Sequence, residues 1–378
     1  MIAFKVLWKI IKIPYLIVWN LWQPIKKLWS SFVFKWNVHV HLNKRVKNVY
    51  SQLENQKEKY IGVCHPEWLG VRNSTIQIFG DERIEIEELY NDKEALKIAQ
   101  GILDKNKRMV VFSGFAYGWD RIARKLKELD PTVTVKMILH GSNALLAEDY
   151  DWETYERMLK LYNEKIIDEL AFVKKSLYEF YKKKGYNVSF VMNDVIVEDK
   201  EKYIVKDKRN DRLKIGLYSS GDRWVKNSYN QLAAASLFDN AEIDSVPASE
   251  RIVELGNLYG VKVEGDENSI SREEMYKKLA NNDINLYVTF TECAPLIPLE
   301  SLELGTICIT GNNHHYFEGT ELEKYLVVSK EDDIMAIYNQ IKYALENKDR
   351  IFELYKDWKE NYSREVEESM KAFLEIKE

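Results

Sequence analysis

The feature that most constrains the fold is an alternation of short apolar runs with amphipathic helical patterns, which occurs twice along the chain. In the first half, strand-like runs cover 60–64, 108–113, 132–139 and 186–192, and helical patterns cover 119–129 and 166–184. In the second half, strands are expected at 213–219, 284–290 and 306–310, and helices at 226–238 and 295–304. Strands that alternate with helices predict parallel sheets with crossover helices.

A run dominated by charged residues, 198–212, separates the two halves and is typical of a linker. A chain of 378 residues is too long for one ordinary domain and suits two. We therefore predict an α/β protein with two Rossmann-like, doubly wound domains, covering residues 51–205 and 206–345. Such a pair places a ligand in the cleft between the carboxyl ends of the strands.

The amino-terminal segment differs in charge from the rest of the chain. Residues 1–53 contain nine Lys and Arg and no acidic residue, whereas the remainder has a net charge of −14. Half of the ten tryptophans lie in the first 36 residues. The apolar run 13–22 is shorter than the roughly 20 residues that span a bilayer, and no signal-peptide cleavage site follows it.

These features predict an amphipathic helical segment, residues 1–50, that binds an anionic membrane surface peripherally. Tryptophan rings favour the bilayer interface, and each basic residue adds about 1 kcal/mol near an anionic leaflet. A core or oligomer-forming helix pair and a true spanning segment are the alternatives. The acidic body argues against a nucleic-acid partner.

Three widely separated cysteines, Cys64, Cys293 and Cys308, show no CxxC spacing. They predict a reducing, cytoplasmic compartment without a disulfide framework or a structural metal site. The glycine fingerprint of dinucleotide-binding domains and the phosphate-loop lysine motif are both absent from the sequence.

The most informative stretch is 284–317, where an apolar strand leads into Glu292 and a helix that begins at Pro295 and ends before Gly305. Glu300 is four residues from both Leu296 and Leu304, so it shares their apolar face and needs a polar partner there. The start of this helix offers unpaired N–H groups to a diphosphate. The alternative is a purely structural unit with an incidental glutamate.

At this point the sequence resembles the GT-B glycosyltransferases, and among them the retaining, family 4-like group. The resemblance rests on Glu-x7-Glu, here Glu292 to Glu300, followed by Gly305-Thr306. It implies that Glu292 contacts the donor sugar and that Glu300 binds the ribose hydroxyls. The backbone from Ala294 through Pro295 to Leu296 would hold sugar and phosphate.

The family also has an arginine and a lysine after the first strand of its second domain. The matching residues are Arg223 and Lys226, although the family usually spaces them slightly wider. Two cations beside the diphosphate would stabilise the leaving group without a metal. Alternatively, both are ordinary surface charges at a helix start.

The resemblance suggests three sites in the first half and one crossing element. Gly70, expected in a loop after the first strand, would approach the donor, and His140, at a strand end, would touch the donor sugar. Asn193 would line the acceptor side of the cleft. The closing helix, 346–378, would cross back to the first domain.

The resemblance implies a metal-independent hexosyltransferase without a cofactor, acting in polysaccharide biosynthesis. A nucleotide-diphosphate sugar would be the donor, and a lipid-linked or cell-surface glycan the acceptor, at the inner face of the cell membrane. Two alternatives stay open. One is a metal-dependent GT-A transferase that uses Asp149 and Asp151, and the other is a membrane-bound scaffold with a degenerate GT-B fold.

Overall fold

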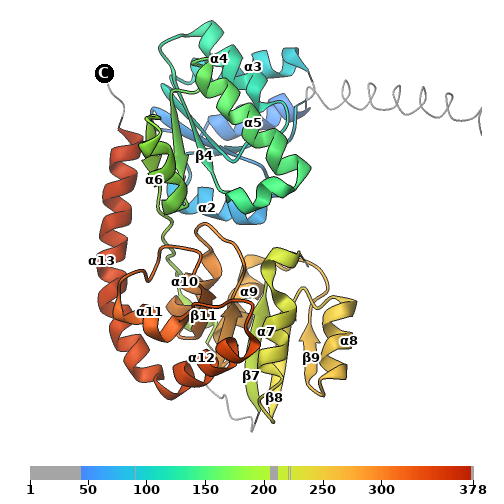
Figure 1. The fold of residues 1–378 in the computed structure, drawn as a ribbon. Helices are drawn as coiled ribbons and strands as arrows, with labels where there is room; N and C mark the ends of the chain where they lie inside the picture. The colour runs from blue at the N-terminus through green and yellow to red at the C-terminus, as the bar shows by residue number, and fades with distance from the viewer. Residues whose placement is uncertain (1–43, 90, 205–211, 220, 222, 376–378) are drawn as a thin grey trace, which may run out of the picture.

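The computed structural model describes residues 44–89, 91–204, 212–219, 221 and 223–375. These residues form two domains, each built on a six-stranded parallel sheet with flanking helices, as Figure 1 shows. The doubly wound α/β architecture predicted from the alternation is therefore confirmed. Most of the segment expected to bind membranes, residues 1–43, lies outside the described residues.

The first sheet has the strand order β2-β1-β3-β4-β5-β6. Its strands are β1 (Tyr60–Cys64), β2 (Arg83–Glu85), β3 (Met109–Ser113), β4 (Thr134–Leu139), β5 (Glu169–Phe172) and β6 (Val188–Phe190). Alternate residues of β3 enter two apolar clusters, Val110 and Phe112 in one and Met109 and Val111 in the other. The sheet is thus buried on both faces, as parallel sheets require.

The second sheet has the order β12-β11-β10-β7-β8-β9. The chain adds strands on one side of β7 up to β9 and then on the other side from β10, so the strand order reverses between β7 and β10 although all strands are parallel. Its strands are β7 (Leu213–Tyr218), β8 (Ala241–Val246), β9 (Lys262–Gly265), β10 (Ile284–Tyr287), β11 (Ile307–Gly311) and β12 (Val327–Val328). In open α/β sheets, ligands bind beyond the carboxyl ends of the strands at such a reversal.

Helices cover the sheets in both domains. In the first domain they are α2 (Leu69–Phe79), α3 (Asp92–Asp104), α4 (Trp119–Leu129), α5 (Asp149–Asn163) and α6 (Lys175–Lys183). In the second they are α7 (Ser228–Ala235), α8 (Glu250–Leu258), α9 (Arg272–Asn281), α10 (Leu296–Glu303), α11 (Glu321–Leu326) and α12 (Ile334–Glu346). Gly305, just past α10, has a φ of 79°, a conformation that favours glycine and ends the helix where the sequence predicts.

Residues 44–53 are helical and belong to the first domain. Val46, Val49 and Leu53 are buried in its core, and Arg45 forms an ion pair with the buried Glu94. The first domain therefore includes residues 44–50, which the sequence-based boundary at residue 51 leaves out.

The helix predicted over 166–184 is wrong in its first half, because strand β5 and helix α6 occupy this stretch. Leu170, Ala171 and Phe172 are fully buried in β5, which lies between β4 and the edge strand β6. A short apolar run of this kind has the same pattern in a buried strand and in a buried helix. The predicted strand 284–290 also ends early, at Tyr287.

The last helix, α13 (Lys348–Leu374), runs along both domains (Figure 1). Its Phe373 packs among Phe79, Met109 and Ile138 of the first domain, and the Phe373 carbonyl accepts a hydrogen bond from Lys136. Among the described residues, no helix combines the length and the apolarity that crossing a bilayer requires.

Candidate functional site between the two domains

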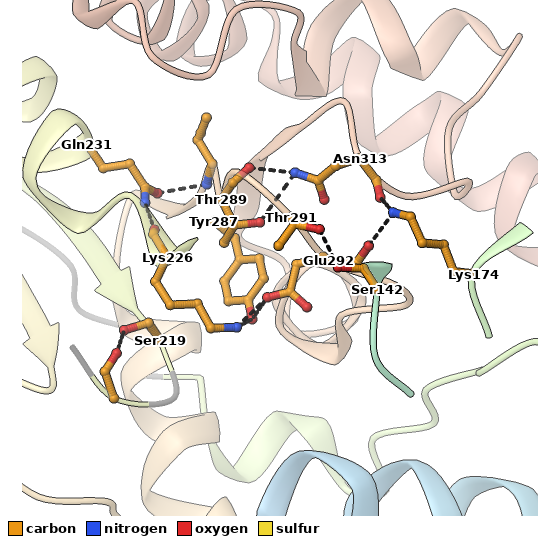
Figure 2. Close-up of polar contacts among 12 residues, drawn as sticks. Ser142, Lys174, Ser219, Lys226, Gln231, Tyr287, Thr289, Thr291, Glu292 and Asn313 are labelled. Carbon is orange, nitrogen blue, oxygen red and sulfur yellow. Dashed lines mark hydrogen bonds and ion pairs between the residues drawn. The ribbon is translucent and has the colours of Figure 1, made fainter. Parts of the chain in front are cut away.

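The candidate site lies where the strand order of the second sheet reverses, between β7 and β10. Lys226 ends a short 3-10 helix, η3 (Trp224–Lys226), in the connection after β7, and Glu292 lies in the connection after β10. Because β7 and β10 are neighbours in the sheet, their carboxyl ends bring the two connections together. Figure 2 shows the Lys226 ammonium directed at the Glu292 carboxylate.

Lys226, Glu292 and Tyr287 form one polar cluster. Lys226 Nζ is hydrogen-bonded and ion-paired to Glu292 Oε1, and it lies 3.4 Å from the Tyr287 hydroxyl. The Tyr287 hydroxyl donates to the same Oε1 atom at 2.9 Å. Burial, reinforced by the Glu292 charge, raises the pKa of Tyr287 well above its usual value, so this hydroxyl stays a donor.

A second layer fixes the backbone around this cluster. Gln231 donates from Nε2 to the Lys226 carbonyl at 2.8 Å, and its Oε1 accepts the N–H of Val288 at 2.8 Å (Figure 2). Asn227 donates to the Val288 carbonyl at 2.9 Å. The connections after β7 and β10 are therefore held together by buried side chains, which sets where Lys226 and Glu292 can lie.

The first domain reaches the same cluster through Lys174. Its ammonium donates to the Glu292 carbonyl at 2.6 Å and to the Asn313 carbonyl at 2.7 Å (Figure 2). Cys293, the next residue after Glu292, is buried among apolar residues of the first domain. The sequence gives no signal for Lys174, because it follows β5, the strand hidden inside the expected helix.

Glu300 lies inside α10 and is buried, so it is not an incidental surface glutamate. Its Oε1 accepts a hydrogen bond from Arg272 Nη2 at 3.1 Å, and the Tyr276 hydroxyl lies 3.5 Å away. Burial raises the pKa of Glu300, while Arg272 and the Tyr276 hydroxyl oppose that shift. The apolar face predicted that a polar partner exists, but nothing in the sequence identified Arg272.

The start of α10 has no side-chain cap. Pro295 is the N-cap residue and Leu296 the first helical residue, one position later than expected. The Ala294 carbonyl accepts a hydrogen bond from Asn193 Nδ2 at 3.2 Å, and Asn193 Oδ1 accepts one from Ser74 at 2.7 Å. Asn193, three residues past β6, thus bridges the first domain to the approach to α10.

His140 follows β4, and its Nε2 atom lies 2.9 Å from the Ser113 hydroxyl. Burial of the ring lowers the pKa of His140 to about 4, so the imidazole is neutral at neutral pH. Two residues further on, the Ser142 hydroxyl lies 2.7 Å from the Thr291 hydroxyl of the second domain. The segment containing His140 therefore reaches the residue before Glu292 (Figure 2).

Two other predicted donor-site residues are not part of the cluster of Lys226, Glu292 and Tyr287. Gly70 belongs to the first turn of α2 rather than to a loop, and it is exposed. The glycine in the tight connection after β3 is Gly114, with a φ of 77°. Arg223 is exposed and forms an ion pair with Glu148 of the first domain, whereas Lys226 pairs with Glu292.

Asp149 and Asp151, the pair of the metal-dependent alternative, lie in the first turn of α5. In the described ranges, no group of three or more His, Cys, Asp or Glu side chains is arranged to hold a metal ion. Burial and the neighbouring Glu148 raise the pKa of Asp151, and Arg223 opposes that shift.

No family model matches the sequence, and neither does any curated protein. The backbone is nevertheless similar to solved structures along most of its length. A glycosyltransferase from Rickettsia africae has a TM-score of 0.57 at 14% identity, covering 85% of this chain and 100% of that one. A sucrose-phosphate synthase from Thermosynechococcus elongatus has a TM-score of 0.56 at 14% identity, covering 77% and 81%.

A UDP-forming α,α-trehalose-phosphate synthase from Burkholderia xenovorans has a TM-score of 0.55 at 12% identity, covering 87% of this chain and 85% of that one. All three matches extend over more than three quarters of the chain, so they include both parallel-sheet domains. The chain therefore has the two-domain GT-B fold that these glycosyltransferases share.

Proposed function

We propose that this protein is a retaining, metal-independent glycosyltransferase of the hexosyltransferase type. It transfers a sugar from a nucleotide-diphosphate sugar to a glycan acceptor between the two domains. The GT-B fold supports this class of reaction. The observation that carries the proposal is the Lys226–Glu292 pair at the reversal of the second sheet, beside residues of the first domain.

The second domain supplies the donor site. Lys226 contributes a positive charge to the diphosphate, and the uncapped start of α10 contributes backbone N–H groups and the positive end of the helix dipole. Glu300 accepts hydrogen bonds from the ribose hydroxyls, with Arg272 holding its carboxylate in place. Glu292 exchanges its pairing with Lys226 for contacts with the donor sugar.

A positive charge and oriented N–H groups stabilise the leaving nucleoside diphosphate directly. A phosphate oxygen of that leaving group takes the proton of the attacking acceptor hydroxyl, on the same face of the sugar, which retains the anomeric configuration. His140, neutral at neutral pH, contributes a hydrogen bond to the sugar rather than a charge. The acceptor enters over the first domain, near Asn193 and the segment that carries His140.

The acceptor is a lipid-linked or cell-surface glycan, and the protein works in polysaccharide biosynthesis, peripherally at the cytoplasmic face of the membrane. The support for this placement is the sequence of residues 1–50, whose basic residues and tryptophans suit an anionic leaflet. The full chain should co-sediment with vesicles of phosphatidylglycerol and phosphatidylcholine at low salt and should dissociate from them at high salt. Equal binding to pure phosphatidylcholine would contradict the electrostatic mechanism.

The transferase proposal is tested by donor binding and turnover. UDP and GDP are compared in thermal unfolding, followed by a panel of UDP- and GDP-sugars assayed for hydrolysis or transfer with membranes present. A nucleotide at 100 times its dissociation constant stabilises by about 2.7 kcal/mol. Lys226→Ala and Glu300→Ala should abolish this stabilisation and reduce turnover sharply.

Two matched variants keep the result interpretable. Lys278→Ala removes another partly buried, ion-paired lysine of the second domain, and Glu303→Gln changes a second glutamate of α10, which is bonded to Tyr355. Both should bind the nucleotide as the wild type does. If no nucleotide stabilises the wild type, the degenerate-scaffold alternative replaces the proposal. If turnover requires manganese and is lost with EDTA, the metal-dependent alternative replaces it.

A further inference from the structure

A group of large side chains is exposed at the carboxyl edge of the first sheet. Leu69, Tyr117 and Tyr150 are each between 45% and 50% exposed, although they come from three separate connections, after β1, β3 and β4. Trp68, partly exposed, precedes Leu69. We call these four residues the first-domain rim. Single exposed apolar residues need no explanation, but a set gathered from three connections marks an interaction surface.

The rim is continuous. The Trp68 and Tyr150 rings meet edge-on, with centroids 6.0 Å apart. The Arg157 guanidinium lies over the Tyr117 ring at 5.4 Å, and Arg157 is two helical turns after Tyr150 on the same face of α5. The exposed rings of Tyr117 and Tyr150 therefore belong to one surface rather than to opposite sides of the domain.

The rim adjoins the candidate site through Asp151. A Cβ atom built on Gly141 would lie 3.8 Å from Asp151 Oδ1, so this carboxylate lies over Gly141. The next residue, Ser142, contacts Thr291 at 2.7 Å, and Thr291 precedes Glu292. A molecule lying on the rim with one end at Asp151 would reach toward the segment that contains Glu292.

The charges around the rim are mainly negative. Glu148, Asp149, Asp151 and Glu153 surround Tyr150 in sequence at the start of α5. Burial raises the pKa of Tyr150, and the nearby Glu88 carboxylate adds to that shift. Two guanidinium groups near the rim already have partners, since Arg223 pairs with Glu148 and Arg157 lies over the Tyr117 ring. A phosphorylated or otherwise anionic ligand would be repelled here.

We propose that the first-domain rim and Asp151 form the acceptor subsite, and that the acceptor there is an uncharged saccharide. One face of a pyranose ring presents C–H groups that pack on an aromatic ring, while its edge presents hydroxyl donors. Asp151 accepts from such a hydroxyl, as carboxylates do. The inference rests on the proposed transferase function, because it assigns the second substrate of the same site.

Saccharide binding to the full chain is measured by saturation-transfer NMR. The probes are maltose, cellobiose, lactose and N,N′-diacetylchitobiose, with glucose 6-phosphate as the anionic comparison. At least one uncharged disaccharide should receive saturation on its ring C–H protons and bind more tightly than glucose 6-phosphate. Tyr150→Ala should weaken that binding roughly tenfold, equivalent to about 1.4 kcal/mol.

Tyr259→Ala is the matched control, because Tyr259 is 47% exposed but follows α8 in the second domain, away from the first (Figure 1). It should leave saccharide binding unchanged, and Asp151→Asn should weaken it. The inference is overturned if no disaccharide binds, if glucose 6-phosphate binds as tightly, or if the two tyrosine variants bind alike. Thermal stabilisation of the Tyr150→Ala variant by UDP separates the transferase proposal from the acceptor-subsite proposal. This stabilisation depends on the donor site alone, so it should be kept in the variant even if saccharide binding fails.

Discussion

Replacing Lys226 by methionine tests the central cluster, because methionine keeps much of the apolar stem and removes the charge. The Glu292 carboxylate would keep the hydrogen bond from Tyr287, and its side chain is 16% exposed to water, so it would not lose all of its polar partners. A hydrogen bond to a charged group contributes about 1.5–3 kcal/mol, and some of that is offset because the lysine no longer has to be desolvated. We expect Lys226→Met to destabilise the protein by about 1.5 kcal/mol.

Glu292→Gln should have a somewhat larger effect, about 2 kcal/mol, because it leaves an ammonium group that is only 9% exposed without its carboxylate. The Lys226→Met/Glu292→Gln double variant no longer has an unpaired charge, so its destabilisation should also be about 2 kcal/mol. The coupling energy of the cycle is then about 1.5 kcal/mol, within the range measured for residues in direct contact.

Urea unfolding, followed by tryptophan fluorescence and circular dichroism together, measures the four free energies and shows whether the two domains unfold as one unit. Lys278→Met is the control, since its partners are Asp244 and Asp266. It should be additive with Glu292→Gln. A coupling below about 0.3 kcal/mol between Lys226 and Glu292 would refute the pairing on which the donor site is built.

Three further predictions concern single residues. Burial raises the pKa of Glu300, so ionisation of Glu300 lowers the stability of the fold as pH rises through that pKa. In thermal unfolding, Glu300→Gln should therefore gain stability relative to wild type between pH 4 and pH 7, and the control variant Glu303→Gln should not. Glu300→Gln should also lose nucleotide binding. The pKa of His140 is lowered to about 4, so the folded state is destabilised relative to the unfolded state as pH falls from 6.5 toward 4. The stability of wild type relative to His140→Gln should therefore fall over that interval, whereas a constant difference would contradict the lowered pKa. Lys174→Met removes two bonds between the domains and should raise KM for the donor and the radius of gyration in X-ray scattering, whereas the exposed Lys183→Met should change neither.

The parts of the fold that the sequence predicted correctly are those where local pattern and tertiary role agree. The strand 60–64 and the helix 119–129 match β1 and α4 in their bounds. The glycine stop of α10 was also predictable, because a positive φ is needed there whatever packs around it. The strand β8, Ala241–Val246, was missed because polar residues alternate along it, and β2 and β12 are too short to show a period.

The candidate site also has a part that the sequence predicted and a part that it did not. The closeness of Glu292 and Lys226 was predictable, because each follows the end of a strand and the parallel topology brings those two ends together. Arg272 and Lys174 were not found, because their contacts depend on how α9 and the first domain pack, and no spacing along the chain records that packing. Gly70 was expected in a loop, whereas the helix α2 begins one residue before it.

Two glutamates, Glu300 buried and Glu292 partly buried, give the physical argument for a functional site. An incidental glutamate would extend into water, since charged residues are rarely buried unless they are paired. Glu300 and Glu292 instead meet cations that lie 28 and 66 positions away in the sequence. Apolar residues of similar volume would often stabilise such an interior as well or better, because they avoid the desolvation of two charges. A strand–helix–strand unit that served only to fold has no need of these pairs. The pair of Glu292 lies where the strand order of the second sheet reverses, against the first domain, and open α/β sheets bind ligands at such a reversal.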